Sequence, residues 1–205
     1  MHSQVSDIDG RYATDAPYDQ RLARLLVRPL VNSPIAPNHV TALSLGLGTA
    51  SALLFANGWP NFAAALFMAA MFADHADGEL ARQSGRTSRL GYYLDYVAGA
   101  ANYTMLFLGL GIGLSHGWIG SAALVLGIAA AASNPIVMAV RLANERRHGA
   151  EAVTHPRFGG FEIEDFAYLI GPVTWLGGLD WFFLAYGLGA IGYLAWQTTD
   201  YLRRI

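Results

Sequence analysis

The sequence has no cysteine and no lysine, and charged residues of any kind are scarce among its 205 residues. Without cysteine, a disulfide framework, a thiolate metal site and a cysteine nucleophile are all excluded. Charged residues make up 14% of the chain, against about 25% in an average soluble domain. The formal net charge of -2 argues against a nucleic acid as the partner.

Two long segments contain no charged residue at all, one between Arg28 and Asp74 and one between Asp95 and Arg141. Each spans about 45 residues, enough for two membrane-crossing helices of roughly 20 residues and a turn. A soluble core of this size has no need of two such segments, so the pattern predicts an all-α membrane protein. The first 17 residues are polar and show no cleavable signal peptide, so we expect the internal helices to direct insertion.

The hydrophobic pattern predicts three parts: a mobile tail over residues 1–16, an interfacial amphipathic helix within 17–36, and six transmembrane helices within 37–205. In the amphipathic part, Leu22, Leu25 and Leu26 share one helical face and arginines occupy another. The fifth span is short, because few uncharged residues separate Asp165 from Asp180. The expected spans are about 38–56, a second ending near 82, 88–114, a fourth ending near 144 with a kink at Pro135, 163–176 and 181–202.

The basic residues give an independent test of this topology. All 13 are arginine, and every one falls on the side of the membrane that the two termini share. The three turns on the opposite side contain none. The positive-inside rule therefore places both termini in the cytoplasm of a bacterial-type inner membrane.

Acidic and small residues recur at helical spacing on either side of the turn between the second and third spans. Asp74, Asp77, Gly78 and Ala81 share one face of the second span. Gly91, Asp95 and Gly99 repeat every four residues on the third. Because the turn is short, the two helices are antiparallel and we expect these faces to meet.

Three carboxylates on facing helices repel one another, and each costs roughly 2.5–3.5 kcal/mol at the centre of a membrane helix. A divalent cation removes both penalties, and oxygen ligands without cysteine favour Mg²⁺ or Mn²⁺. Arg82 and Arg86 can neutralise phosphates beside such a site. The alternative is that Asp74 and Asp77 only end a helix in the headgroup region, next to glycines that pack the spans together.

The spacing D-x2-D-G-x2-A-R-x8-G-x3-D resembles the signature of the CDP-alcohol phosphotransferase (CDP-alcohol phosphatidyltransferase) family. The matching residues are Asp74, Asp77, Gly78, Ala81, Arg82, Gly91 and Asp95. Upstream, Pro37-Asn38-His39-Val40-Thr41 is similar to the family's Pro-Asn-x-x-Thr at the start of the first span. The layout of six spans after an interfacial helix matches as well.

The resemblance implies an enzyme of phospholipid or related synthesis. It would transfer a substituted phosphate from a CDP-linked donor to an alcohol acceptor, release CMP, and form a homodimer as relatives do. Asp74, Asp77 and Asp95 would bind the metal ions, Mg²⁺ or Mn²⁺. The nucleotide would be bordered by Thr41, Asp74, Asp77, Gly78, Ala81 and Arg82.

The sequence departs from the family pattern at its fourth aspartate, a metal ligand and general base, which is Gly99 here. One interpretation is a working transferase whose base is Asp95, Glu164 or Asp165, the last two being at the start of the fifth span. A second is a pseudoenzyme that binds a CDP-linked ligand or metal and acts as a partner or regulator. A third is a transporter, which the absence of an inverted second motif disfavours.

Two arginines are candidates for substrate binding. Arg86 follows the motif, and Arg141 lies about one turn inside the end of the fourth span. Arg141 would contact the diphosphate of the donor or a phosphate of the acceptor, or else snorkel to the membrane interface. The acceptor alcohol, and whether the donor carries diacylglycerol or a small head group, stay open at the level of sequence.

Overall fold

The computed structural model describes residues 18–149, 157–158 and 161–203, and within them the chain is almost entirely helical. The all-α prediction is confirmed, with one two-residue hairpin added by β1 (Arg157–Phe158) and β2 (Phe161–Glu162). The expected tail over 1–16 lies outside the described residues. The helices are α2 (Tyr18–Leu26), η1 (Arg28–Leu30), α3 (Pro37–Ala56), α4 (Pro60–Ser84), α5 (Arg89–Leu114), α6 (Ser121–His148), η3 (Ile163–Leu169), α7 (Ile170–Trp175) and α8 (Leu179–Arg203).

Four of these helices, α3, α5, α6 and α8, are long and apolar enough to cross a membrane. The chain is therefore a multi-pass membrane protein. The 25-residue α4 is long enough, but the carboxylates near its end lower its hydropathy. The expected fifth span is the seven-residue 3₁₀ helix η3 followed by the six-residue α7. Together they rise about 23 Å, less than the roughly 30 Å hydrocarbon core.

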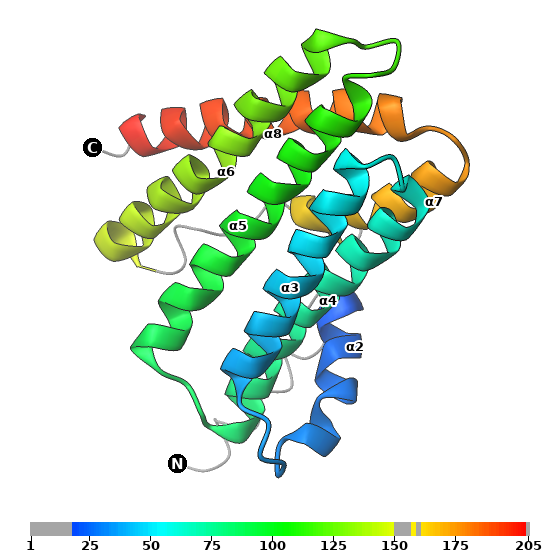
Figure 1. The fold of residues 1–205 in the computed structure, drawn as a ribbon. Coiled ribbons are helices and arrows are strands. Elements are labelled where there is room, and N and C mark those ends of the chain that lie inside the picture. Colours follow the sequence, from blue (N-terminus) through cyan, green and yellow to red (C-terminus); the bar gives the residue numbers. More distant parts are fainter. Residues whose placement is uncertain (1–17, 150–156, 159–160, 204–205) are drawn as a thin grey trace.

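The α4–α5 turn forms the antiparallel hairpin that the sequence predicts. Gly85 ends α4 in the left-handed conformation, with φ of 67°, which a glycine adopts without strain. Ser88 then caps α5, because its hydroxyl accepts a hydrogen bond of 2.9 Å from the backbone N–H of Gly91. Figure 1 shows this hairpin at the same end of the molecule as α2 and the start of α3.

Glycines let α5 approach its neighbours closely. A Cβ on Gly109 would lie 2.8 Å from Cα of Ala52 on α3. A Cβ on Gly111 would lie 3.1 Å from Cα of Gly127 on α6. The glycine-rich stretch of α5 is thus occupied by contacts within the chain, as small residues at membrane helix interfaces commonly are.

Buried polar side chains join the same helices. Asn102 on α5 donates a 2.8 Å hydrogen bond to the Ser44 hydroxyl on α3, which donates at 2.9 Å to the Ala70 carbonyl on α4. Thr104 donates at 3.2 Å to the carbonyl of Ala131, which lacks its usual helical donor because residue 135 is proline. Helix α6 therefore continues through Pro135 with this carbonyl bonded.

Helix α2 packs on α4 through one narrow face, where Ala23 and Val27 are buried against Ala76 and Leu80. The leucines of its predicted apolar face, Leu22, Leu25 and Leu26, are instead 51–55% exposed. They point away from the helices of this chain, which leaves them free to contact lipid. Helix α8 runs across α6 in Figure 1 and packs against it.

Candidate active site

The three aspartates of the motif converge at the hairpin end of α4 and α5. Asp74 and Asp77 lie on α4 and Asp95 lies on α5. One carboxylate oxygen of each lies within 4.8 Å of the other two. Asp77 is 3% exposed, Asp74 is half-buried and Asp95 is exposed, so the cluster has a buried wall and an open side. The predicted meeting of the two faces is confirmed.

This donor set fits a divalent cation. Two oxygen ligands of one Mg²⁺ are separated by at most twice the metal–oxygen distance, about 4.2 Å. The oxygens of the three aspartates lie within 4.8 Å of one another, so small side-chain adjustments bring them to one cation. All are carboxylates, the ligands that hard cations such as Mg²⁺ and Mn²⁺ prefer. Asp74, Asp77 and Asp95 would hold the ion, which would neutralise their mutual repulsion.

Helix α3 contributes a direct contact to this cluster. The Thr41 hydroxyl donates a hydrogen bond to Oδ2 of Asp77, and both side chains are buried. Pro at the first position of α3 starts the helix so that Thr41 lies one turn in. The threonine of the Pro-Asn-x-x-Thr segment therefore orients a carboxylate of the α4 motif, as outer-shell partners of metal ligands do.

Gly78 of the motif lies under a basic side chain. A Cβ on Gly78 would lie 3.4 Å from Nη1 of Arg82. Arg82 pairs with Glu79 at 2.8 Å, and Arg24 of α2 lies 3.7 Å from the same carboxylate. Glu79 is buried and has Arg24 as a second partner, whereas the Arg82 side chain is 59% exposed, so the Arg82 guanidinium can also reach a phosphate.

Gly99 lies beside the aspartates, one helical turn beyond Asp95. A Cβ built on Gly99 would lie 3.8 Å from Oδ2 of Asp74 and 3.8 Å from Cε of Met138 on α6. Both are ordinary contact distances, so crowding at Cβ does not explain the glycine. In the part of the chain that the structure describes, only the three aspartates form a metal-type cluster, so no fourth acid joins it.

The remaining predicted residues are dispersed around this cluster. Ala81 is half-buried on α4, after Gly78. Arg86 donates hydrogen bonds of 3.3 and 3.1 Å to the carbonyls of Ser33 and Ile35, and so holds the segment before α3. Arg141 is 8% exposed on α6.

The two acids proposed as alternative bases belong to η3. Asp165 is half-buried there. The side chain of Glu164 lies outside what the structure describes. The structure therefore groups Asp74, Asp77 and Asp95 with Thr41.

A second polar cluster was not predicted. Glu145 on α6 accepts hydrogen bonds from the hydroxyls of Tyr92 and Tyr96 on α5, the latter at 2.8 Å. Arg146 donates to the Tyr93 hydroxyl at 2.9 Å. These hydrogen bonds join α5 to α6 at residues that flank Asp95 in the sequence. A single sequence signals only the i, i+4 spacing of the tyrosines, and not their partner on another helix.

The comparisons with known proteins agree with this geometry. The family model described as CDP-alcohol phosphatidyltransferase matches residues 34–198. A CDP-diacylglycerol–serine O-phosphatidyltransferase from Mycobacterium leprae is 38% identical over 76 residues, which are 37% of this chain. The match spans only 25% of that relative's length.

Two solved structures of one enzyme share the fold. The phosphatidylinositol phosphate synthase of Mycobacterium tuberculosis with CDP-DAG bound has a TM-score of 0.63 at 19% identity, over 90% of this chain and 92% of that one. Its complex with manganese and citrate has a TM-score of 0.69 at 18% identity, over 88% of each chain. Since the family model covers most of the sequence and the aspartates converge as its motif requires, the chain belongs to the CDP-alcohol phosphatidyltransferase family.

Proposed function

We propose that this protein transfers a substituted phosphate from a CDP-linked donor to an alcohol, with release of CMP, in phospholipid or related synthesis. The observation that carries the proposal is the convergence of Asp74, Asp77 and Asp95 in a family member. The donor is a CDP-linked lipid such as CDP-diacylglycerol. The names of the similar proteins, one acting on CDP-diacylglycerol and one solved with CDP-DAG, support this assignment.

The reaction exchanges one oxygen–phosphorus bond for another. The acceptor hydroxyl oxygen bonds to the phosphorus that carries the alcohol or lipid, while that phosphorus loses its bond to the oxygen of the CMP phosphate. CMP leaves with the electron pair, and the hydroxyl proton goes to a carboxylate. In such displacements the attacking and leaving oxygens lie roughly in line.

Mg²⁺ or Mn²⁺ at the three aspartates would offset the charge of the diphosphate, which is the chemistry a divalent cation supplies in phosphoryl transfer. The manganese complex of the similar synthase supports this assignment. Thr41, Gly78, Ala81 and Arg82 border the nucleotide. Their position beside Asp77 supports this role, because Thr41 bonds that carboxylate directly.

Asp95 is the proposed base, since it is the most exposed of the three carboxylates and faces the open side of the cluster. Glu164 and Asp165 of η3 are the alternatives. Arg86 and Arg141 are assigned to the substrate phosphates. Arg86 would bind a phosphate close to the segment before α3, where it donates a hydrogen bond to the Ile35 carbonyl.

The same proposal includes the finer topology: six spans, both termini in the cytoplasm, the leucine face of α2 in the membrane interface, and a homodimer. Trp59, Trp118 and Trp181 support it, because they are 59–69% exposed and lie at the turns without arginine. Exposed tryptophans are typical of the membrane–water boundary.

The purified protein in lipid nanodiscs, given CDP-diacylglycerol, Mg²⁺ or Mn²⁺ and a set of alcohols, should release CMP. Asp95→Asn should lower the rate at least about 10²-fold, since it removes both a ligand and the proposed base. The comparison of Asp165→Asn and Glu164→Gln with Asp95→Asn identifies the base. Glu145→Gln is the matched control, because it replaces an acid that bonds tyrosines outside the cluster.

The pseudoenzyme interpretation is the second candidate, and Gly99 is the observation that favours it. It predicts saturable binding of CDP-diacylglycerol with no CMP release for any alcohol or metal. Release above the Asp95→Asn background contradicts it.

A further inference from the structure

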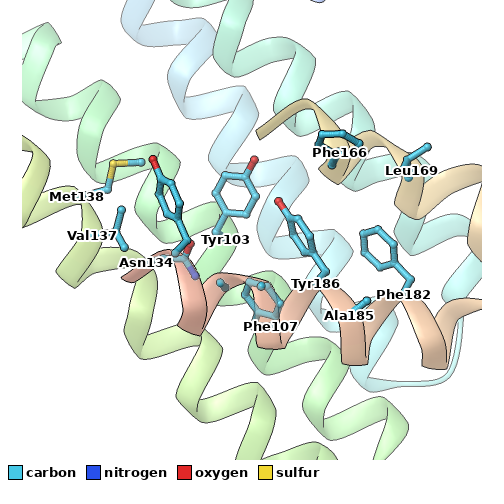
Figure 2. Close-up of a pocket in the computed structure, with 13 residues that line it drawn as sticks. Tyr103, Phe107, Asn134, Val137, Met138, Phe166, Leu169, Phe182, Ala185 and Tyr186 are labelled. Atoms are coloured by element: carbon cyan, nitrogen blue, oxygen red, sulfur yellow. The ribbon is translucent and has the colours of Figure 1, made fainter. Parts of the chain in front are cut away.

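A cavity of about 380 Å³ lies between α5, α6, η3 and α8 (Figure 2). We call it the aromatic cavity. Tyr103 reaches it from α5, Met138 from α6, Phe166 from η3 and Tyr186 from α8.

The walls of the aromatic cavity are mostly apolar, with tyrosine hydroxyls and Asn134 as their polar groups. The ring of Tyr186 stacks on Phe107 at 5.6 Å and on Phe182 at 5.1 Å, both at 23°. Tyr103 packs edge-on against Phe67 at 5.9 Å. Among the described residues that line the cavity, none is charged. A preformed apolar cavity of this volume is typical of a small-molecule or lipid-tail site.

The aromatic cavity borders the aspartate cluster through Gly99. Met138 lines the cavity, and its Cε lies 3.8 Å from the position of a Cβ on Gly99. Oδ2 of Asp74 lies 3.8 Å from the same position. The position of the missing Gly99 side chain is thus within contact distance of both a carboxylate of the cluster and a residue of the cavity wall. An aspartate there, as the family pattern has, would place a charged group between them.

We propose that the aromatic cavity binds the apolar part of the acceptor, so that the acceptor is a long-chain alcohol and not a sugar phosphate or an amino acid. Its hydroxyl would reach the aspartates past Gly99. This inference rests on the proposed transfer reaction and names the class of acceptor for it. A phosphorylated or zwitterionic acceptor needs charged partners, which the described cavity walls lack.

The positions of Thr41 and Gly99 around the aspartates favour the acceptor, and not the donor, as the molecule that binds in the aromatic cavity. Thr41 bonds Asp77 on the α3 side of the cluster, where the nucleotide is placed. Gly99 neighbours Asp74 on the side of α6. Because attacking and leaving oxygens lie roughly in line, the acceptor approaches from the side opposite the CMP, which is the side of the cavity.

The rim of the aromatic cavity offers a route from the bilayer. Phe166 and Leu169 of η3 line it and are 45% and 46% exposed. The short η3 and α7 do not cover this side as a full-length span would. A long-chain alcohol dissolved in the membrane can therefore enter the cavity between η3 and α8.

The test is a binding measurement that needs no turnover. A primary alcohol of about twelve carbons with a mid-chain diazirine is photolysed with the wild-type protein in nanodiscs, and the labelled peptides are mapped by mass spectrometry. We expect saturable labelling of the cavity segments of α6 and α8. Unlabelled dodecanol should compete, whereas glycerol 3-phosphate and inositol phosphate should not.

Two glycines of α8 provide a matched pair of variants. A Cβ on either Gly189 or Gly192 would meet nothing within 4 Å, so a side chain can start at both positions without a clash, but of the two only Gly189 lines the cavity. Gly189→Trp should lower the labelling about tenfold or more by filling the cavity, and Gly192→Trp should leave it unchanged. Equal labelling in the two variants overturns the proposal.

Measurements of turnover and of donor binding distinguish an acceptor site from a site for the donor's acyl chains. CMP release with dodecanol should fall in Gly189→Trp and persist in Gly192→Trp, while binding of CDP-diacylglycerol should stay the same in both. Loss of donor binding in Gly189→Trp would assign the cavity to the donor's acyl chains and overturn the proposal. Cavity labelling without CMP release would refute the transfer reaction alone.

Discussion

At the scale of single residues, the site depends on how the carboxylates of α4 are held. The Thr41 hydroxyl donates a hydrogen bond to Asp77, and both side chains are buried. Such an outer-shell hydrogen bond fixes the orientation of a ligand before the cation arrives. We therefore propose that Thr41 prepares the cation site, in addition to any contact with the nucleotide.

Thr41→Val should weaken Mn²⁺ binding about 10–100-fold, because it removes this bond with little change of shape. Electron paramagnetic resonance of free Mn²⁺ measures the affinity. Thr49→Val is the matched control, since Thr49 lies on the same helix and bonds only Leu45 and Met105. Equal affinities in the two variants would show that Thr41 does not orient the site.

Gly99→Asp should lower CMP release with long-chain alcohols. The new carboxylate would lie next to Asp74, where it repels that group, and would fill the gap toward Met138. Rates with dodecanol at saturating Mn²⁺ provide the measurement. A large gain in rate would instead mean that the natural site is impaired by its missing aspartate.

At the scale of helices, much of the architecture could be predicted and some could not. The bounds of α3 and α5 follow from Pro37 at the first turn of α3, Gly58 with positive φ after its end, and Ser88 as the cap of α5, which are all local signals. The convergence of the aspartates follows from spacing and a short turn. Contacts between helices distant in sequence, such as Glu145 with Tyr92, leave no periodic signal.

The segment predicted as the fifth span shows the limit of hydropathy in another way. Its helices, Ile163–Leu169 and Ile170–Trp175, lie close to the predicted bounds, but the 3₁₀ geometry of the first was not predicted. Acids at its beginning shorten the apolar stretch, and composition does not distinguish a short α-helix from a 3₁₀ helix. The aromatic cavity also escaped prediction, because its walls come from four elements far apart in sequence.

Close packing of α5 on α3 should make Gly109 intolerant of any side chain. Gly109→Ala would force its Cβ against the backbone of Ala52, so the two helices must separate and the melting temperature should fall by several degrees. Gly46→Ala on α3 meets nothing within 4 Å and should keep or raise stability by about 0.5–1 kcal/mol. Thermal unfolding in detergent compares them; equal melting temperatures would contradict this packing.

At the scale of the whole molecule, the carboxylate cluster lies at one end of an apolar helix bundle. The hairpin of α4 and α5, the start of α3 and helix α2 gather at one end, while exposed tryptophans mark the turns at the other. The arginines favour the cytoplasm for the first end. The carboxylates therefore lie where a water-soluble nucleotide and a membrane lipid can both reach them.

The absence of cysteine makes this orientation testable without background labelling. In intact bacterial cells, a membrane-impermeant maleimide should label Gly117→Cys in the α5–α6 turn, and should label Thr87→Cys in the α4–α5 turn only after lysis. Both positions are exposed, so accessibility differs only by side of the membrane. The reverse pattern would invert the topology.

The most direct measurement of the central claim is Mn²⁺ binding to the purified protein, followed by electron paramagnetic resonance. We predict that the wild-type protein binds Mn²⁺, that Asp77→Asn and Asp95→Asn each weaken binding severely, and that Asp180→Asn, an acid at the start of α8, has no effect. Unchanged Mn²⁺ affinity after the loss of Asp77 and Asp95 together would contradict a shared cation at these carboxylates.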